Sequence, residues 1–297
     1  MKRLASSVSF LVLFVAACGG IGVQAHTLSL AYKSGETYKY SLHIVLKYTI
    51  AAQGLSVPFN LDVAAKEAVK VKSVDSSGTA DLTIDLTDLS VKTTINGTTN
   101  TTTTTTTTSV EVKVASDGRI VSVNGSALGS SGSLPGMSGA EGGLVSAILP
   151  DKPVKPGDTW TKNYDQTNPM NSTGSYHVST DNKYLRDEKV GSLSTAVVES
   201  KINAAFDLTL EMSSLSGEGG TSLFPSGAAL KGITMKGTSK SGVTTWIETS
   251  ARRIVKSHST GTVDATITLN MAPGSTTAGL SGPITFKGTQ TLEMNPA

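Results

Sequence analysis

Residues 37–50 read TYKYSLHIVLKYTI, and their apolar side chains fall on every second position. This period of two puts them on one face of an extended strand, because successive residues of a strand point to opposite sides of the sheet. The inward set is Tyr38, Tyr40, Leu42, Ile44, Leu46, Tyr48 and Ile50. Because the opposite face is mostly polar, the stretch predicts a long antiparallel strand with one buried side.

The same alternation continues along the chain. Apolar residues hold the odd positions from Leu55 to Val71, with a bend or bulge expected at Ala64 and Ala65, and the next strand slips its register by one residue at Asp88. Helical periodicity is nearly absent, and only the run 144–149 predicts a single helical turn. We therefore expect an all-β fold of long antiparallel strands in one or two curved sheets.

The chain divides into two β halves with similar turns. A Gly/Ser-rich linker, 125–143, separates a first half, 27–124, from a second half, 144–297. The sequence KSGETY at 33–38 is echoed by KPGDTW at 155–160, and two weaker matches follow in the same order. We interpret each motif as a tight turn followed by a strand with a large aromatic as its first inward residue, and the matches as an internal duplication.

Residues 101–108 are eight consecutive threonines. Threonine favours strands, so a hairpin edge is one reading. Without apolar alternation the run has no face to bury, and we expect a loop, with O-glycosylation as a functional alternative.

The N-terminus reads as an export signal. Lys2 and Arg3 precede a short apolar run, and Val15-Ala16-Ala17-Cys18 has the form of a lipobox. We predict a signal peptide at 1–17 and acylation of Cys18, for example with palmitate. Residues 18–26 would then tether the fold to the membrane, reaching about 26 to 29 Å when extended.

A second processing outcome remains open. Val23-Gln24-Ala25 fits an ordinary signal-peptidase site, which would release an unlipidated chain. The first outcome places the protein at the cell membrane or outer membrane of a bacterium, facing away from the cytoplasm. The second makes it periplasmic or secreted.

The charge balance excludes a nucleic-acid partner. The chain has 25 basic and 23 acidic residues, and removal of Lys2 and Arg3 leaves 23 of each. A neutral mature chain has no basic footprint for nucleic acid. The single cysteine leaves no thiol for a structural disulfide, so the core alone must hold the fold.

No motif points to catalysis or a metal. The four histidines are dispersed along the chain, and no metal-ligand spacing, nucleophile elbow or phosphate-binding loop is present. They are His26, His43, His177 and His258. We therefore expect neither an enzyme nor a cofactor.

Two segments resemble a known family. Residues 28–85, with KSGETYKY near the start and VDSSGTA near the end, and LPDKPVKPGDTW at 149–160 resemble an uncharacterised family of exported bacterial β-rich proteins. That resemblance implies export and no transferable activity. A more distant likeness, in architecture alone, is to lipoprotein carriers of the LolA and LppX kind, whose curved sheet holds acyl chains.

These features favour a membrane-anchored binding module for a lipid or another apolar molecule. If the sheet is strongly curved, its inward face would line the ligand site. The predicted lining residues are Tyr38, Tyr40, Leu42, Ile44, Leu46 and Tyr48. The alternative is a structural or protein-interaction component of the cell envelope.

Overall fold

The computed structural model describes residues 25–124, 147–165, 173–211, 230–271 and 282–297. Every regular element within these ranges is a β-strand, so none of them holds a helix long and apolar enough to cross a membrane. The strands are β1 (Thr37–Ala52), β2 (Leu55–Val74), β3 (Ala80–Ile95), β4 (Thr98–Thr104), β5 (Thr108–Val114), β6 (Ile120–Asn124), β7 (Thr159–Asp165), β8 (Thr173–Val190), β9 (Leu193–Glu211), β10 (Leu230–Glu248), β11 (Ile254–Met271) and β12 (Ile284–Pro296).

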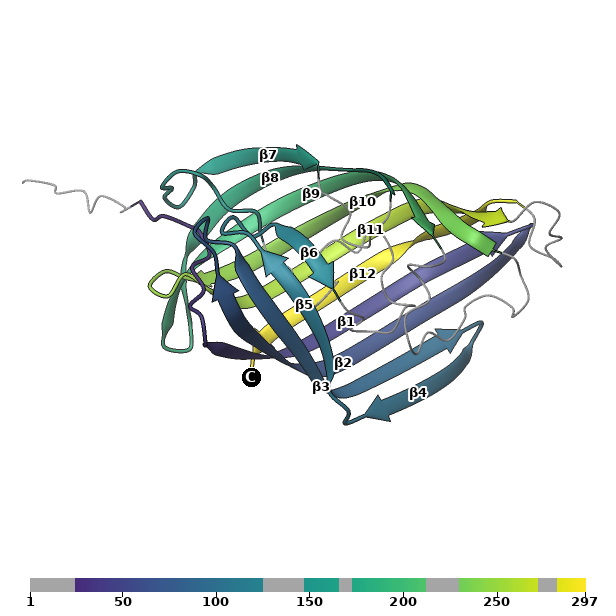
Figure 1. Ribbon diagram of the computed structural model, residues 1–297, viewed down its shortest axis with the longest axis horizontal. Helices are drawn as coiled ribbons and strands as arrows, with labels where there is room; N and C mark the ends of the chain where they lie inside the picture. The colour runs from purple at the N-terminus through teal and green to yellow at the C-terminus, as the bar shows by residue number, and fades with distance from the viewer. Residues whose placement is uncertain (1–24, 125–146, 166–172, 212–229, 272–281) are drawn as a thin grey trace, which may run out of the picture.

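All twelve strands belong to one antiparallel sheet, which confirms the predicted fold class. The order is β6-β5-β3-β2-β1-β12-β11-β10-β9-β8-β7, and β4 pairs with β3 beside this path. The sheet curls so that β5 and β6 lie in front of the wall formed by the later strands (Figure 1). Its terminal strands β6 and β7 are not paired with each other, so the sheet is open.

The core fills the inside of this curl. Strand β1 alternates exposed and buried residues from Thr37 to Tyr48, as the period of two predicts. Apolar residues from β1, β2, β3, β5 and β8–β12 join in one buried cluster. We call the side of the sheet that carries this cluster the inner face.

The predicted register slip lies between β2 and β3. The pairing passes from Ala64–Ser90 to Lys66–Thr87, so that two residues of β3 oppose Ala65. Asp88 has a positive φ of 50° at this point. The bulge keeps both Leu86 and Leu89 buried, because it resets the alternation after one exposed residue.

Two local expectations were wrong. Part of the threonine run is a strand rather than a loop, since β4 pairs with β3 from Leu89–Thr104 to Ile95–Thr98. Backbone pairing at a sheet edge needs no apolar face, and threonine's β-propensity suffices there. The helical turn expected at 144–149 is also absent from its described part, because the amides of Ala147 and Ile148 bond to side chains of the sheet.

The two predicted turn motifs have the same hydrogen bonds. The Gly35 amide donates to the Val71 carbonyl, and the Val71 amide donates back to Glu36. Gly157 and Asp158 make the equivalent pair of bonds with Tyr184. Both glycines have positive φ, 86° and 98°, which only glycine adopts without strain. The internal duplication of the two halves stays a prediction.

The end of the sheet where β1 begins is crossed by two segments. The N-terminal segment, residues 26–32, bonds to Ser116 through Leu30 and to Arg252 through Ala31. His26 and Val154 form an isolated bridge. The second segment is residues 147–150, which we call the strap, and we call this end of the sheet the strap end.

The predicted signal peptide, Cys18, most of the 18–26 tether and the 125–143 linker lie outside the described residues.

Candidate ligand-binding face

The six predicted lining residues share the inner face of β1. They are Tyr38, Tyr40, Leu42, Ile44, Leu46 and Tyr48, and their exposed fractions are only 2–7%. The sheet thus brings them together on one side as expected. Their own surface is covered by packing within the protein.

The three tyrosines of this set differ in their hydroxyl partners. Tyr40 donates to the Ile254 carbonyl at 2.6 Å, and Tyr38 donates to the Glu36 carboxylate. The Tyr48 hydroxyl is buried without a partner, while its ring contacts Phe286 at a centroid distance of 4.2 Å. Burial raises the pKa of each of the three phenols.

Glu67 is the most unusual group on the inner face. It lies on β2 directly opposite Tyr40 of β1 and Leu86 of β3. Its exposed fraction is 2%, and neither carboxylate oxygen has a hydrogen-bond partner. Burial raises its pKa to about 8, since desolvation disfavours the charged form. Buried polar groups are rarely left unpaired, so this carboxyl requires an explanation.

Among the residues that the structure describes, none forms an ion pair with Glu67. Arg253, which acts on the charge of the neighbouring Tyr40, has its Nε paired with Glu248 at 2.8 Å and its guanidinium 5.0 Å from the centre of the Tyr38 ring. Tyr32 and Tyr40 are close enough for the Glu67 charge to raise their pKa values. Glu67 therefore lies among tyrosines, with the local arginine engaged elsewhere.

The polar groups of β8–β10 on the same face are satisfied instead. Thr245 accepts from the Ala147 amide at 2.8 Å, and Ser200 accepts from the Ile148 amide at 3.2 Å. Ser200 donates in turn to Asn182, which donates to the Trp160 carbonyl at 3.1 Å. Thr245 and Ser200 thus accept hydrogen bonds from two backbone amides of the strap, which is not itself part of a strand.

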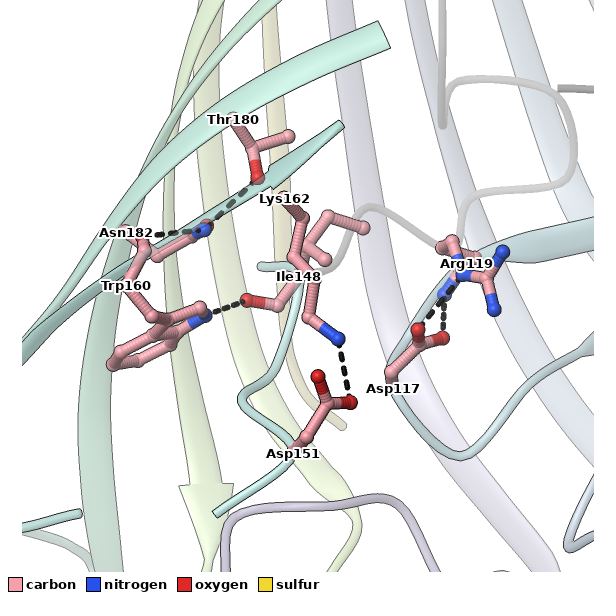
Figure 2. A network of polar contacts seen from close by, with 8 residues as sticks. All are labelled: Asp117, Arg119, Ile148, Asp151, Trp160, Lys162, Thr180 and Asn182. Atoms are coloured by element: carbon pink, nitrogen blue, oxygen red, sulfur yellow. Dashed lines mark hydrogen bonds and ion pairs between the residues drawn. The ribbon is translucent and has the colours of Figure 1, made fainter. Parts of the chain in front are cut away.

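The strap links the two open edges of the sheet. Trp160 of β7 donates to the Ile148 carbonyl at 2.9 Å, as Figure 2 shows. On the other side, the Leu149 amide donates to the Asp117 carbonyl in the β5–β6 turn at 2.8 Å. Arg119 of this turn lies 5.3 Å from the centre of the Tyr164 ring on β7. The edges are thus held by the strap and by side chains, without a strand ladder between them.

The opposite end of the sheet is less well covered. Here the buried inner-face residues give way to half-buried apolar ones. They include Ile50, Phe59, Leu61, Val91, Ile233 and Ile267. Leu55 and Ile95 are 73% and 48% exposed. We call this the open end; the apolar inner face reaches the surface there.

Neither of two hollows lined by described residues contains a predicted lining residue. One, of about 400 Å³, lies beside His26, Asp187 and Thr249. The other, of about 570 Å³, lies over Gly242 and is bordered by Lys201 and Lys240.

Each histidine lies beside a carboxylate. The closest pairs are His177 with Asp165 at 2.9 Å and His43 with Asp62 at 3.0 Å. Within the described residues, no three histidine, cysteine or acidic side chains are arranged to hold a metal ion.

Sequence reasoning missed Glu67. The signal was available, because Glu67 falls in the odd, inward series of β2 between Ala65 and Val69. An acidic residue at a core position of an alternating strand is itself informative. Whether it has a partner could not be read from the sequence, since that depends on side chains far away in the chain.

No family model matches the chain, and no curated protein matches it. Among solved structures, the chain is similar to DynF from the dynemicin biosynthesis pathway of Micromonospora chersina, at 7% identity over 93% of this chain and 86% of that one. The TM-score is 0.22, so this likeness carries no argument. The predicted resemblance to exported proteins and lipoprotein carriers stays a prediction.

Proposed function

We propose that this protein is a non-catalytic binding module for a lipid or another apolar molecule. The observation that carries the proposal is the inner face, whose buried side chains are mostly apolar and which reaches the surface at the open end through Leu55 and Ile95. An open sheet with such a face can admit an apolar ligand when its walls separate.

Separation of the walls would break few backbone bonds. Strands β6 and β7 share no ladder, and the strap bonds to β9 and β10 through two side chains. A typical hydrogen bond contributes only about 0.5 to 1.5 kcal/mol net. Apolar surface exposed by the separation would be covered again by the ligand.

We also propose that acylated Cys18 holds the protein at the membrane. Residues 26–32 lie across the strap end, so the tether would leave the fold there. The strap end would then face the membrane and the open end would point away. Replacement of Cys18 by alanine should move the protein out of the membrane fraction, and unchanged retention would contradict the anchor.

Binding can be tested with N-phenyl-1-naphthylamine, an uncharged apolar fluorophore. Wild type should enhance its emission saturably. Ile95→Lys, which adds a charge at the open end, should weaken binding at least fivefold. Val121→Lys is the matched control, because Val121 is also 48% exposed but lies on β6 near the strap end. Equal binding by both variants would contradict entry at the open end.

A second candidate is a structural or protein-interaction component of the envelope. The packing of the six β1 residues, at 2–7% exposure, favours it, because a filled interior leaves the outer surface to act. Absence of saturable binding in the fluorophore experiment would support this alternative.

A further inference from the structure

We infer that Glu67 is the recognition group for the polar head of an amphiphilic ligand, and that this head is a hydrogen-bond donor, best an amine. The inference rests on the proposed function and adds the chemical class of the ligand. It starts from the absence of any partner for either Glu67 oxygen.

The surroundings of Glu67 favour a donor over an acceptor. Burial keeps Glu67 protonated at neutral pH when nothing is bound. An ammonium group beside it would favour the ionised form, which offers two acceptor oxygens and no donor. The nearby Tyr40 hydroxyl is committed to the Ile254 carbonyl at 2.6 Å, and Arg253 is committed to Glu248. Among the described residues, none donates a hydrogen bond to either Glu67 oxygen, the nearby Tyr32 included, and a ligand is free to supply both a donor and a positive charge.

Charge balance selects an amine among the donors. An alkylammonium would form a charge-assisted hydrogen bond with Glu67, and the pair would be neutral inside an apolar interior. A fatty acid would instead bring a second carboxyl group to the same site, where the two groups could not both ionise and no net positive charge would balance them. An alcohol would donate a hydrogen bond without the charge.

The apolar inward residues of β1 beside Glu67 can contact the hydrocarbon tail of such a ligand. Glu67 is opposite Tyr40, and the inward residues of β1 continue from there to Tyr48. Eight residues of strand span about 26 Å. Between these ends the inward side chains are Leu42, Ile44 and Leu46 of β1. A head group at Glu67 would thus place a tail along the face that leads to the open end.

The test compares dodecylamine, dodecanol and dodecanoate, which share a tail and differ in their heads. Calorimetric titration below the micellar range should give at least tenfold tighter binding of the amine than of the acid, with the alcohol between them. Glu67→Gln should lose this preference while it keeps the affinity for dodecanol within about threefold. Glu111→Gln, on the outer face of β5, is the control and should bind like wild type.

The outcomes separate the two claims. If wild type binds all three compounds equally, or if Glu67→Gln keeps the amine preference, the inference is wrong and the binding module stands. If wild type binds none of them, both the inference and the proposed function are wrong. The circular dichroism spectrum of Glu67→Gln should match that of wild type, which would show that a lost preference for the amine is not caused by unfolding.

Discussion

Two regions of the inner face treat buried polar groups in opposite ways. On β8–β10, the side chains of Asn182, Ser200 and Thr245 all have partners, and most of these lie on the strap or on Trp160. On β2, Glu67 is equally buried and has none. The first group is satisfied within the fold, whereas Glu67 is the group to which we assign ligand recognition.

The largest effect should come from the pH dependence of Glu67. Its pKa rises from an ordinary 4.5 to about 8 in the folded state. Between these values the folded chain keeps a proton that the unfolded chain has lost, so the free energy of unfolding should fall as pH rises and level off above about 8. The total is on the order of 5 kcal/mol.

Glu67→Gln removes this titration. Urea unfolding at about pH 5 and about pH 8 should therefore show a flatter pH response than wild type and a more stable variant at the higher pH. An identical slope in both proteins would mean that Glu67 is ionised or paired in the folded state.

Removal of the strap acceptors should have the next largest effect. The double variant Ser200→Ala, Thr245→Val removes the side-chain acceptors of the Ala147 and Ile148 amides, which should cost about 2 to 5 kcal/mol. Hydrogen exchange at these two amides should accelerate. Thr262→Val, on the exposed outer face of β11, is the control and should leave both readouts unchanged.

A matched pair of tyrosines sharpens the comparison. Tyr40→Phe leaves the Ile254 carbonyl without its donor and should cost about 1 to 2 kcal/mol. Tyr48→Phe removes a hydroxyl that has no partner, so it should be neutral or stabilising. Thermal unfolding distinguishes them, and equal destabilisation by both would contradict the assignment of partners.

The smallest effect should come from the outer face. Lys72 and Glu111 form an ion pair at 2.8 Å with both side chains about half exposed. Exposed pairs are screened by water and salt. Glu111→Gln should therefore leave the unfolding midpoint unchanged, and a clear loss would show that outer-face pairs matter as much as inner-face ones.

Most of the fold could be predicted from the sequence, because the alternation of apolar and polar residues along a strand is a local property. The inward face of β1 and the bulge at Asp88 could both be predicted from spacing. Strand β4 could not, because an edge strand is held by backbone bonds that leave no apolar pattern. The strap could not be predicted either, because its conformation depends on distant partners. Ser200 lies 52 residues after Ile148, and Thr245 lies 98 residues after Ala147.

The candidate site was predictable only in part. The six residues of β1 follow from one period, whereas the importance of Glu67 depends on what is absent around it. A missing partner is a property of the whole fold, and no short stretch of sequence encodes it.

Native mass spectrometry of the full-length protein, purified from membranes in mild detergent and followed by lipid extraction, tests the central claim most directly. The account predicts a co-purifying amphiphile in near-stoichiometric amount in wild type and a reduced amount in Ile95→Lys. A wild-type mass equal to that of the processed chain, with or without the proposed acyl anchor, and no other extractable lipid would contradict it.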